Sequence, residues 1–327
     1  MIHIIMTIDY EIFGNGRGDV KRHMIEPMNR LLGITNRYNV PLTIMFEVYE
    51  YIYFKKYDDR LRRDFGYSPA EIIQDQINTA YEHGHDIQLH IHPQFVKMRY
   101  IHKRFIPEIP ELSVFDMNEQ EVYNLIRRGK ETLESMISAN DYQCNALRLS
   151  NMGWVPAPVH VARAMERLGI VVHSLASMCA PIRTTGYQRI GDTRVYEIPI
   201  YTVPTKGYEY LKPRYLSTLA YVWLHSPPRI FKKSDKKLTS HKDHQNCRGI
   251  KWDLSKLSYK DMIKMLDYAI EHYDYENYEI PLVMIGHTKD FFNDKNLEKF
   301  IKTVLDEYKS TVRFSTFSKF ITENLQR

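Results

Sequence analysis

Apolar residues along the chain alternate between two patterns, short continuous runs and helically spaced positions. Residues 2–8 form a β-favouring run that ends at the polar Asp9, and residues 22–38 carry apolar side chains at helical intervals. The alternation recurs to the end of the chain. We predict further strands at 41–48, 85–90, 145–149, 170–175, around 196–203, 281–285 and 312–315, and further helices at 69–82, 118–137, 158–168, 259–273 and 296–308.

The order of these elements determines the expected fold class. Strands separated by helices require right-handed crossovers and a parallel sheet. Seven or so such units over most of the 327 residues favour a closed or nearly closed barrel over an open sheet. We therefore expect an α/β barrel that occupies residues 1–327 as a single domain.

The strand–helix rhythm stops at about residues 205–258, where Lys, Arg and Pro accumulate. Within this range, residues 227–251 contain eight Lys or Arg and two Asp, which gives a local charge of +6. We predict that 205–258 forms a basic excursion from the barrel. Its charge could attract an acidic glycan, a diphosphate carrier or membrane headgroups, although a solvated insertion is the commoner explanation of such a run.

Composition narrows the classes of protein that remain. With 43% hydrophobic and 26% charged residues the chain is globular, and a net charge of +5 is too small to indicate a nucleic-acid binder. Cys144, Cys179 and Cys247 lack Cys-x-x-Cys spacing, so we expect reduced thiols. The N-terminus lacks a basic leader segment and no run approaches the roughly 18 apolar residues of a membrane span, so we expect a cytoplasmic protein.

Polar residues that can bind metals or transfer protons stand at the ends of several predicted strands. Side chains at i and i+2 of an extended segment point to the same face, so the two acids, and likewise the two histidines, can aim at one point. Two imidazoles and a carboxylate are a standard ligand set for a catalytic zinc or a similar divalent ion. We expect a metal or acid–base site formed by Asp9, Glu11, His90, His92, Arg148 and His287.

The chain also resembles a known family through several pieces that occur in a fixed order: MTIDYEIFG, GHDIQLHIHPQF, the segment from Arg148, IGHTKDFF and the terminal RFSTF. It resembles the polysaccharide deacetylase (NodB-homology) family of carbohydrate esterases, in a divergent branch with an Asp-x-Glu first motif. The resemblance covers most residues outside 205–258. It implies an irregular (β/α)7 barrel that removes an acyl group, usually acetyl, from an amino sugar with one divalent metal, for which zinc is expected.

The resemblance assigns roles by position. It implies that Asp9 is the general base, that Arg148 holds the Asp9 carboxylate, and that His287 is the general acid. It also implies that Glu11 is the acidic metal ligand and His90 the first metal histidine.

Three positions depart from the family pattern or stay open. The usual second metal histidine falls at Gln94, and because an amide is a poor zinc ligand we assign the third ligand to His92. The aspartate that orients the late histidine has no clear match. Trp154 could form a platform for a sugar face or simply pack the barrel rim.

The expected function is removal of an N-acyl group from an amino sugar in intracellular glycan or surface-polysaccharide biosynthesis. The substrate could be nucleotide-linked or lipid-linked, and the oligomeric state stays open. One alternative is a catalytically silent carbohydrate-binding relative. A second is a binder of anionic polymer or a membrane surface through residues 227–251, for which the sequence shows charge but no nucleic-acid motif.

Overall fold

The computed structural model describes residues 1–12, 18–110, 112–150, 156–175, 185–204 and 249–326. At its centre lies a curled sheet in which consecutive strands along the main path pair in parallel. In spatial order these strands are β12 (Ile280–Met284), β1 (Ile2–Tyr10), β2 (Thr43–Glu47), β3 (Asp86–Ile91), β6 (Ala146–Leu149), β7 (Val172–His173) and β9 (Tyr196–Glu197). Strand β13 (Val312–Ser315) pairs with the first half of β1, and β8 (Gln188–Arg189) pairs antiparallel with β9.

The two edges of the curled sheet meet. Beyond β9, Ile200 forms a parallel bridge to Val283 of β12, and the backbone N–H of Tyr201 donates to the carbonyl of Val283 at 2.9 Å. This contact closes the ring of strands, because β12 already pairs with β1 on its other side. The expected α/β barrel is therefore confirmed.

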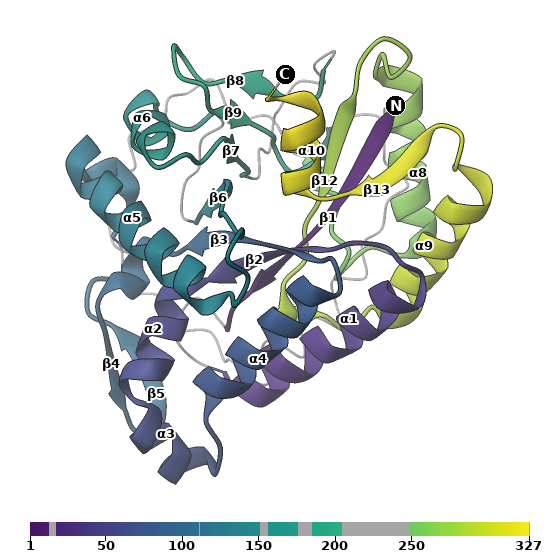
Figure 1. The fold of residues 1–327 in the computed structure, drawn as a ribbon. Coiled ribbons are helices and arrows are strands. Elements are labelled where there is room, and N and C mark those ends of the chain that lie inside the picture. Colours follow the sequence, from purple (N-terminus) through teal and green to yellow (C-terminus); the bar gives the residue numbers. More distant parts are fainter. Residues whose placement is uncertain (13–17, 111, 151–155, 176–184, 205–248, 327) are drawn as a thin grey trace.

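Helices surround the strands (Figure 1). They are α1 (Glu26–Arg37), α2 (Val48–Lys56), α3 (Asp58–Phe65), α4 (Pro69–Glu82), α5 (Glu119–Met136), α6 (Val159–Arg167), α8 (Tyr259–His272), α9 (Asp294–Glu307) and α10 (Phe317–Asn324). Short elements are the π-helix η1 (Lys21–Ile25), the 3₁₀ turns η2 (Pro93–Val96), η3 (Val114–Asp116) and η5 (Thr288–Asp290), and the hairpins β4 (Met98–Ile101) with β5 (Arg104–Pro107) and β10 (Thr202–Pro204) with β11 (Gly249–Lys251).

The sequence pattern did not predict helix α2. Its aromatic and β-branched residues favour strand by propensity and follow β2 without a break. The helix begins there because the side chain of Glu47, at the end of β2, caps it by accepting from the backbone N–H of Tyr49 at 3.1 Å.

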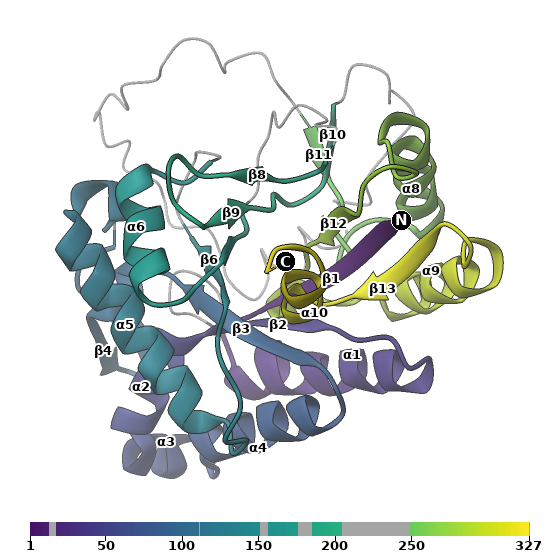
Figure 2. The same cartoon turned by 45° about the horizontal axis from the view of Figure 1, so that its top comes forward.

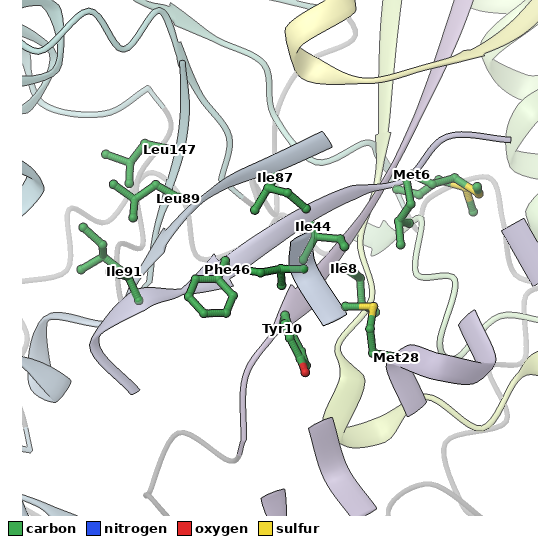
Figure 3. Close-up of a cluster of buried hydrophobic side chains, with 14 of the residues drawn as sticks. Met6, Ile8, Tyr10, Met28, Ile44, Phe46, Ile87, Leu89, Ile91 and Leu147 are labelled. Carbon is green, nitrogen blue, oxygen red and sulfur yellow. The ribbon is translucent and has the colours of Figure 1, made fainter. Parts of the chain in front are cut away.

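Alternation along the strands separates two buried layers. On one face, strand residues such as Ile8, Ile44 and Leu89 belong to the larger apolar cluster, which also includes helix residues such as Met28 (Figure 3). The opposite face points into the barrel, where Ile5 and Met45 belong to a separate apolar cluster. Further along the same inward rows, Asp9, four residues beyond Ile5, and Glu47, two residues beyond Met45, reach the carboxyl end of the barrel.

Helix α10 closes the opposite, amino-terminal end of the barrel. Its residues Phe317, Phe320 and Ile321 join the inner apolar cluster, and Figure 2 shows the helix over the middle of the ring of strands. In the first turn of this helix, the backbone N–H and the hydroxyl of Ser318 donate to the buried carboxylate of Asp86 at 3.1 and 2.8 Å. The inside of the barrel is therefore sealed at this end.

One boundary of the predicted excursion needs correction. Most of it, residues 205–248, lies outside the described residues, but Trp252 is fully buried against Tyr201 and Phe300, and Asp253 bridges Ile285 of the barrel. Residues 249–251 pair with β10, and residues 252–254 run beside the end of β12, so the segment from 249 onward packs with the barrel. Within the described part of the chain, no helix is long and apolar enough to span a membrane.

Candidate metal and acid–base site

Polar side chains end the inward rows at the carboxyl ends of the strands. Strand register places Glu47 beside His90 and His90 beside Arg148, and a backbone bridge places Asp9 beside His287. All of these except His287 are buried. Residues that lie far apart in the sequence are therefore gathered at one end of the barrel, where ligands of such folds bind.

Four buried side chains could hold one metal ion. Glu11, Glu47, His90 and His92 each place one ligand atom within 4.8 Å of the others. Oε2 of Glu11 lies 3.3 Å from Nε2 of His90 and 3.0 Å from Nδ1 of His92. The buried atoms Glu11 Oε2 and His90 Nε2 have no hydrogen-bond partner among the described residues. Because buried polar atoms without partners are costly, this pair fits a bound cation.

The ring of His90 is oriented for such a role. Its Nδ1 lies 2.8 Å from the carbonyl oxygen of Arg148. A carbonyl only accepts hydrogen bonds, so Nδ1 carries the hydrogen and the lone pair of Nε2 faces Glu11 when the ring is neutral. Burial alone would lower the pKa of His90, but Asp9 and Glu11 raise it above its ordinary value. Without a metal the ring therefore tends to hold a proton.

Asp9 is held by Arg148 through one carboxylate oxygen only. Arg148 is buried and donates to Asp9 Oδ1, to the hydroxyl of Thr7 at 2.9 Å and to the carbonyl of Ser174 at 3.1 Å. The second oxygen, Asp9 Oδ2, lies 3.5 Å from Nε2 of His287. Burial alone would raise the pKa of Asp9, but Arg148 first, with nearby imidazoles, lowers it below its ordinary value. Asp9 is therefore ionised, with one oxygen available to accept a proton.

The late histidine has an aspartate beside it that the sequence did not reveal. Asp290 Oδ1 lies 3.9 Å from His287 Nδ1, and both atoms are buried without a hydrogen bond among the described residues. The other oxygen of Asp290 binds Lys256 at 3.1 Å, and Lys256 also binds Asp253 at 3.2 Å. Burial lowers the pKa of His287 although Asp290 and Asp9 oppose this. Asp290 stands where it could orient the imidazole.

Sequence reasoning also missed three charged residues around Glu11. Lys289 binds Glu11 Oε1, which leaves only Oε2 facing the two histidines. Glu47 ends β2, and the strand-end rule that selected Asp9 would also have selected it. Glu50 accepts from the backbone N–H of Ile12 at 2.9 Å. The sequence contains a weaker signal for Lys289 and Glu50, because neither residue stands at the end of a predicted strand.

Acidic side chains outnumber cationic ones at this site. The acids are Asp9, Glu11, Glu47 and Glu50, and the cations are Arg148 and Lys289. If all four acids were ionised and the histidines neutral, two negative charges would remain uncompensated, which is the charge that one divalent cation balances. Burial, and then neighbouring carboxylates, raise the pKa of Glu47 and of Glu50 well above the ordinary value.

No protein-family model matches the sequence, and no curated protein matches it. Solved structures do match. A protein from Mycobacterium smegmatis described as a polysaccharide deacetylase aligns over 98% of this chain and 89% of its own, with a TM-score of 0.52 and 14% identity. The chain has the polysaccharide deacetylase fold.

The deacetylase fold is not limited to one chemistry. The 4-α-glucanotransferase from Thermococcus litoralis aligns over 98% of this chain and 40% of its own, with a TM-score of 0.54 and 11% identity. At this identity the likeness shows the fold alone, so the function has to be argued from the residues of the site.

On this deacetylase fold, the structure brings together the six strand-end residues that the sequence predicted, Asp9, Glu11, His90, His92, Arg148 and His287. Gln94, the alternative to His92, is buried in η2. Trp154 and most of the basic segment 227–251 lie outside the described residues. The roles of the six residues stay predictions.

Proposed function

We propose that the protein is a metal-dependent hydrolase that removes an N-acyl group, most simply acetyl, from an amino sugar. The observation that carries the proposal is the meeting of two constellations at the carboxyl end of a deacetylase-type barrel. One is the ligand group Glu11, His90 and His92, and the other is the pair of Asp9 and His287. An acid and an imidazole next to a metal are what amide hydrolysis requires.

The residues of the site have separate roles in the proposed reaction. Glu11, His90 and His92 would hold a divalent ion, which when bound polarises an acyl oxygen and acidifies a water. Asp9 would take a proton from the attacking water through Oδ2, because Oδ1 is bound to Arg148. His287 would donate a proton to the departing amine, because an amide nitrogen leaves poorly unless it is protonated.

The geometry favours amide hydrolysis over glycosyl transfer, although both occur on this fold. Glycoside cleavage usually needs two carboxyl groups free to contact the sugar on either side of the scissile bond. Here Arg148 binds Asp9 and Lys289 binds Glu11, and the unpartnered Nε2 of His90 has no role in that chemistry. A metal-assisted reaction uses all of these groups.

The finer assignment, to a nucleotide-linked or lipid-linked amino sugar of intracellular glycan or surface-polysaccharide biosynthesis, is part of the proposal. We would incubate the metal-loaded protein with free, nucleotide-linked and lipid-linked N-acyl amino sugars and follow them by mass spectrometry. A mass loss equal to replacement of acetyl by hydrogen is expected for one class, with Asp9→Asn protein as the inactive control.

The silent carbohydrate-binding relative is the rival that the same experiment addresses. It is motivated by Gln94, which stands where the family has its second metal histidine. Sugar binding by a stoichiometrically metal-loaded protein, with no mass loss from any member of the panel, would reject the hydrolase in favour of this rival.

A further inference from the structure

We propose that Glu47 is a fourth protein ligand of the metal, so that the centre contains two imidazoles and two carboxylates and holds an ion that takes five or six ligands, such as Mn²⁺ or Fe²⁺. This inference rests on the metal centre of the proposed function. It concerns a residue that the family resemblance does not assign.

The first support is the position of Glu47. It is buried at the carboxyl end of β2, and its register partner on β3 is His90, so both side chains enter the barrel at the same level. One oxygen, Oε1, is fixed by the N–H of Tyr49 at 3.1 Å. The other, Oε2, lies 2.8 Å from Nδ1 of His92. The capping contact therefore directs one oxygen at the ligand group.

The second support is the crowding at His92. Its Nδ1 lies between two carboxylate oxygens, 3.0 Å from Glu11 Oε2 and 2.8 Å from Glu47 Oε2. A single ring N–H can make one good hydrogen bond, so it cannot satisfy both oxygens. A cation bound by Nδ1 of His92 and by the two carboxylate oxygens would satisfy all three atoms. Oε2 of Glu47 also accepts from the backbone N–H of His92 at 2.6 Å, which still leaves it a lone pair for an ion.

The number of ligands bears on the kind of metal. Four protein ligands fill a tetrahedral zinc ion, as in structural zinc sites, and leave no position for water. An ion that prefers about six ligands, with oxygen among them, keeps positions for a water and an acyl oxygen. If Glu47 is a ligand and the site is hydrolytic, the ion is therefore of the Mn²⁺ or Fe²⁺ kind and not four-coordinate zinc.

A pair of metals bridged by Glu11 is the main competing arrangement. Asp9, Glu11 and His287 form a second group that could hold an ion. However, Arg148 and Lys289 already bind one oxygen each of Asp9 and Glu11. A second divalent ion would also give this site an uncompensated positive charge, so one ion in the group of Glu47 fits better.

The chain offers a matched control for a test. Glu50 is also a buried acid near Glu11, one turn from Glu47, but it is not in the ligand group. Glu47→Gln and Glu50→Gln each remove one carboxylate, and only the first removes a proposed ligand. We would titrate the purified wild-type protein and both variants with Mn²⁺ and read free Mn²⁺ by electron paramagnetic resonance.

We expect Glu47→Gln to weaken Mn²⁺ binding by about 10- to 100-fold and Glu50→Gln to weaken it much less. Equal losses in the two variants would show an effect of charge alone and would overturn the ligand assignment. If the wild-type protein binds no divalent ion at all, the proposed function itself fails. These two failures are distinguishable because the first requires a wild-type protein that binds the metal.

A second measurement separates a ligand from a residue that only orients His92, and its first part uses the wild-type protein alone. Co²⁺ in a five- or six-coordinate site absorbs visible light weakly, and four-coordinate Co²⁺ absorbs strongly. We expect weak absorption from the Co²⁺-loaded wild-type protein and a changed spectrum in Glu47→Gln. Strong four-coordinate absorption in the wild-type protein, or an unchanged spectrum in Glu47→Gln, would overturn the proposal.

Discussion

At the scale of single residues, the site separates functions between the two oxygens of each key carboxylate. Asp9 gives Oδ1 to Arg148 and keeps Oδ2 beside His287, and Glu11 gives Oε1 to Lys289 and keeps Oε2 for the ligand group. Each cation thus fixes its acid in one orientation. The two acids can therefore have different roles although they lie two residues apart.

This separation predicts different losses for Asp9→Asn and Glu11→Gln. Asp9→Asn should keep stoichiometric metal and lose about 100- to 10,000-fold in turnover, because it removes the proposed general base. Glu11→Gln should lose metal affinity, because it removes a proposed ligand. Metal content by elemental analysis, together with turnover, checks both. Loss of metal from Asp9→Asn with retention in Glu11→Gln would mean that the roles are exchanged.

Protonation of His90 predicts a pH dependence of metal binding. Its raised pKa means that the metal-free protein holds a proton there at pH values where an ordinary histidine is neutral, and a metal must displace that proton. Burial lowers the pKa of His92 to about 3, so His92 releases none near neutral pH. Affinity should fall about tenfold per pH unit below the pKa of His90. Calorimetry in buffers of different ionisation enthalpy should show proton release on metal binding, from His90 and from Glu47, whose pKa is also raised, and a pH-independent affinity would contradict this.

At the scale of elements, the segment that follows β12 packs tightly against residues 254–255. A Cβ on Gly286 would lie 2.6 Å from Leu254 Cδ1 and 2.8 Å from Ser255 Oγ, closer than van der Waals contact. Ser255 Oγ also accepts from the backbone N–H of His287 at 3.2 Å. The position of the proposed acid therefore depends on a glycine that lets two chain segments approach.

We expect Gly286→Ala to destabilise the protein by about 1–3 kcal/mol through overpacking, and to lower turnover by displacing His287. Gly33→Ala is the matched control, because Gly33 lies within helix α1 and nothing is within 4 Å of its added Cβ. It should be neutral or stabilising by about 0.5–1 kcal/mol. Urea unfolding measures both, and equal stability of the two variants would refute the packing argument.

At the scale of the whole molecule, the barrel has a sealed end and a chemical end. Asp86 and helix α10 seal the amino-terminal end, while the acids and histidines occupy the carboxyl end. Sealing one end leaves the other as the side from which substrate would approach. Stability and the proposed catalysis thus depend on opposite ends of the same strands, as is usual in such barrels.

The seal predicts a stability effect without a direct effect on the site. Asp86→Ala removes the acceptor for the two Ser318 donors and for Gln88 Nε2, which donates at 2.7 Å. Leaving buried donors unpaired should cost about 1–3 kcal/mol. Asp75→Ala, on the exposed face of α4, should change stability by less than about 0.5 kcal/mol. Urea unfolding compares them, and Mn²⁺ affinity should be unchanged in folded Asp86→Ala protein.

The sequence by itself determined the order of strands and helices and most of the candidate site. These features are local, because periodicity reports which face of a segment is buried, and Asp9, Glu11, His90 and His92 stand next to the strand ends that the pattern reveals. Helix α2 escaped prediction because its propensity favours strand, and the cap that starts it depends on how Glu47 is placed.

Only the tertiary structure decided which further charges join the site. Glu47 contacts His92 across 45 residues of sequence, and Lys289 contacts Glu11 across 278. Such contacts follow from the order and register of the strands, with β2 between β1 and β3 and with β12 beside β1. No local pattern encodes that order, because strand neighbours are selected by the packing of the whole barrel.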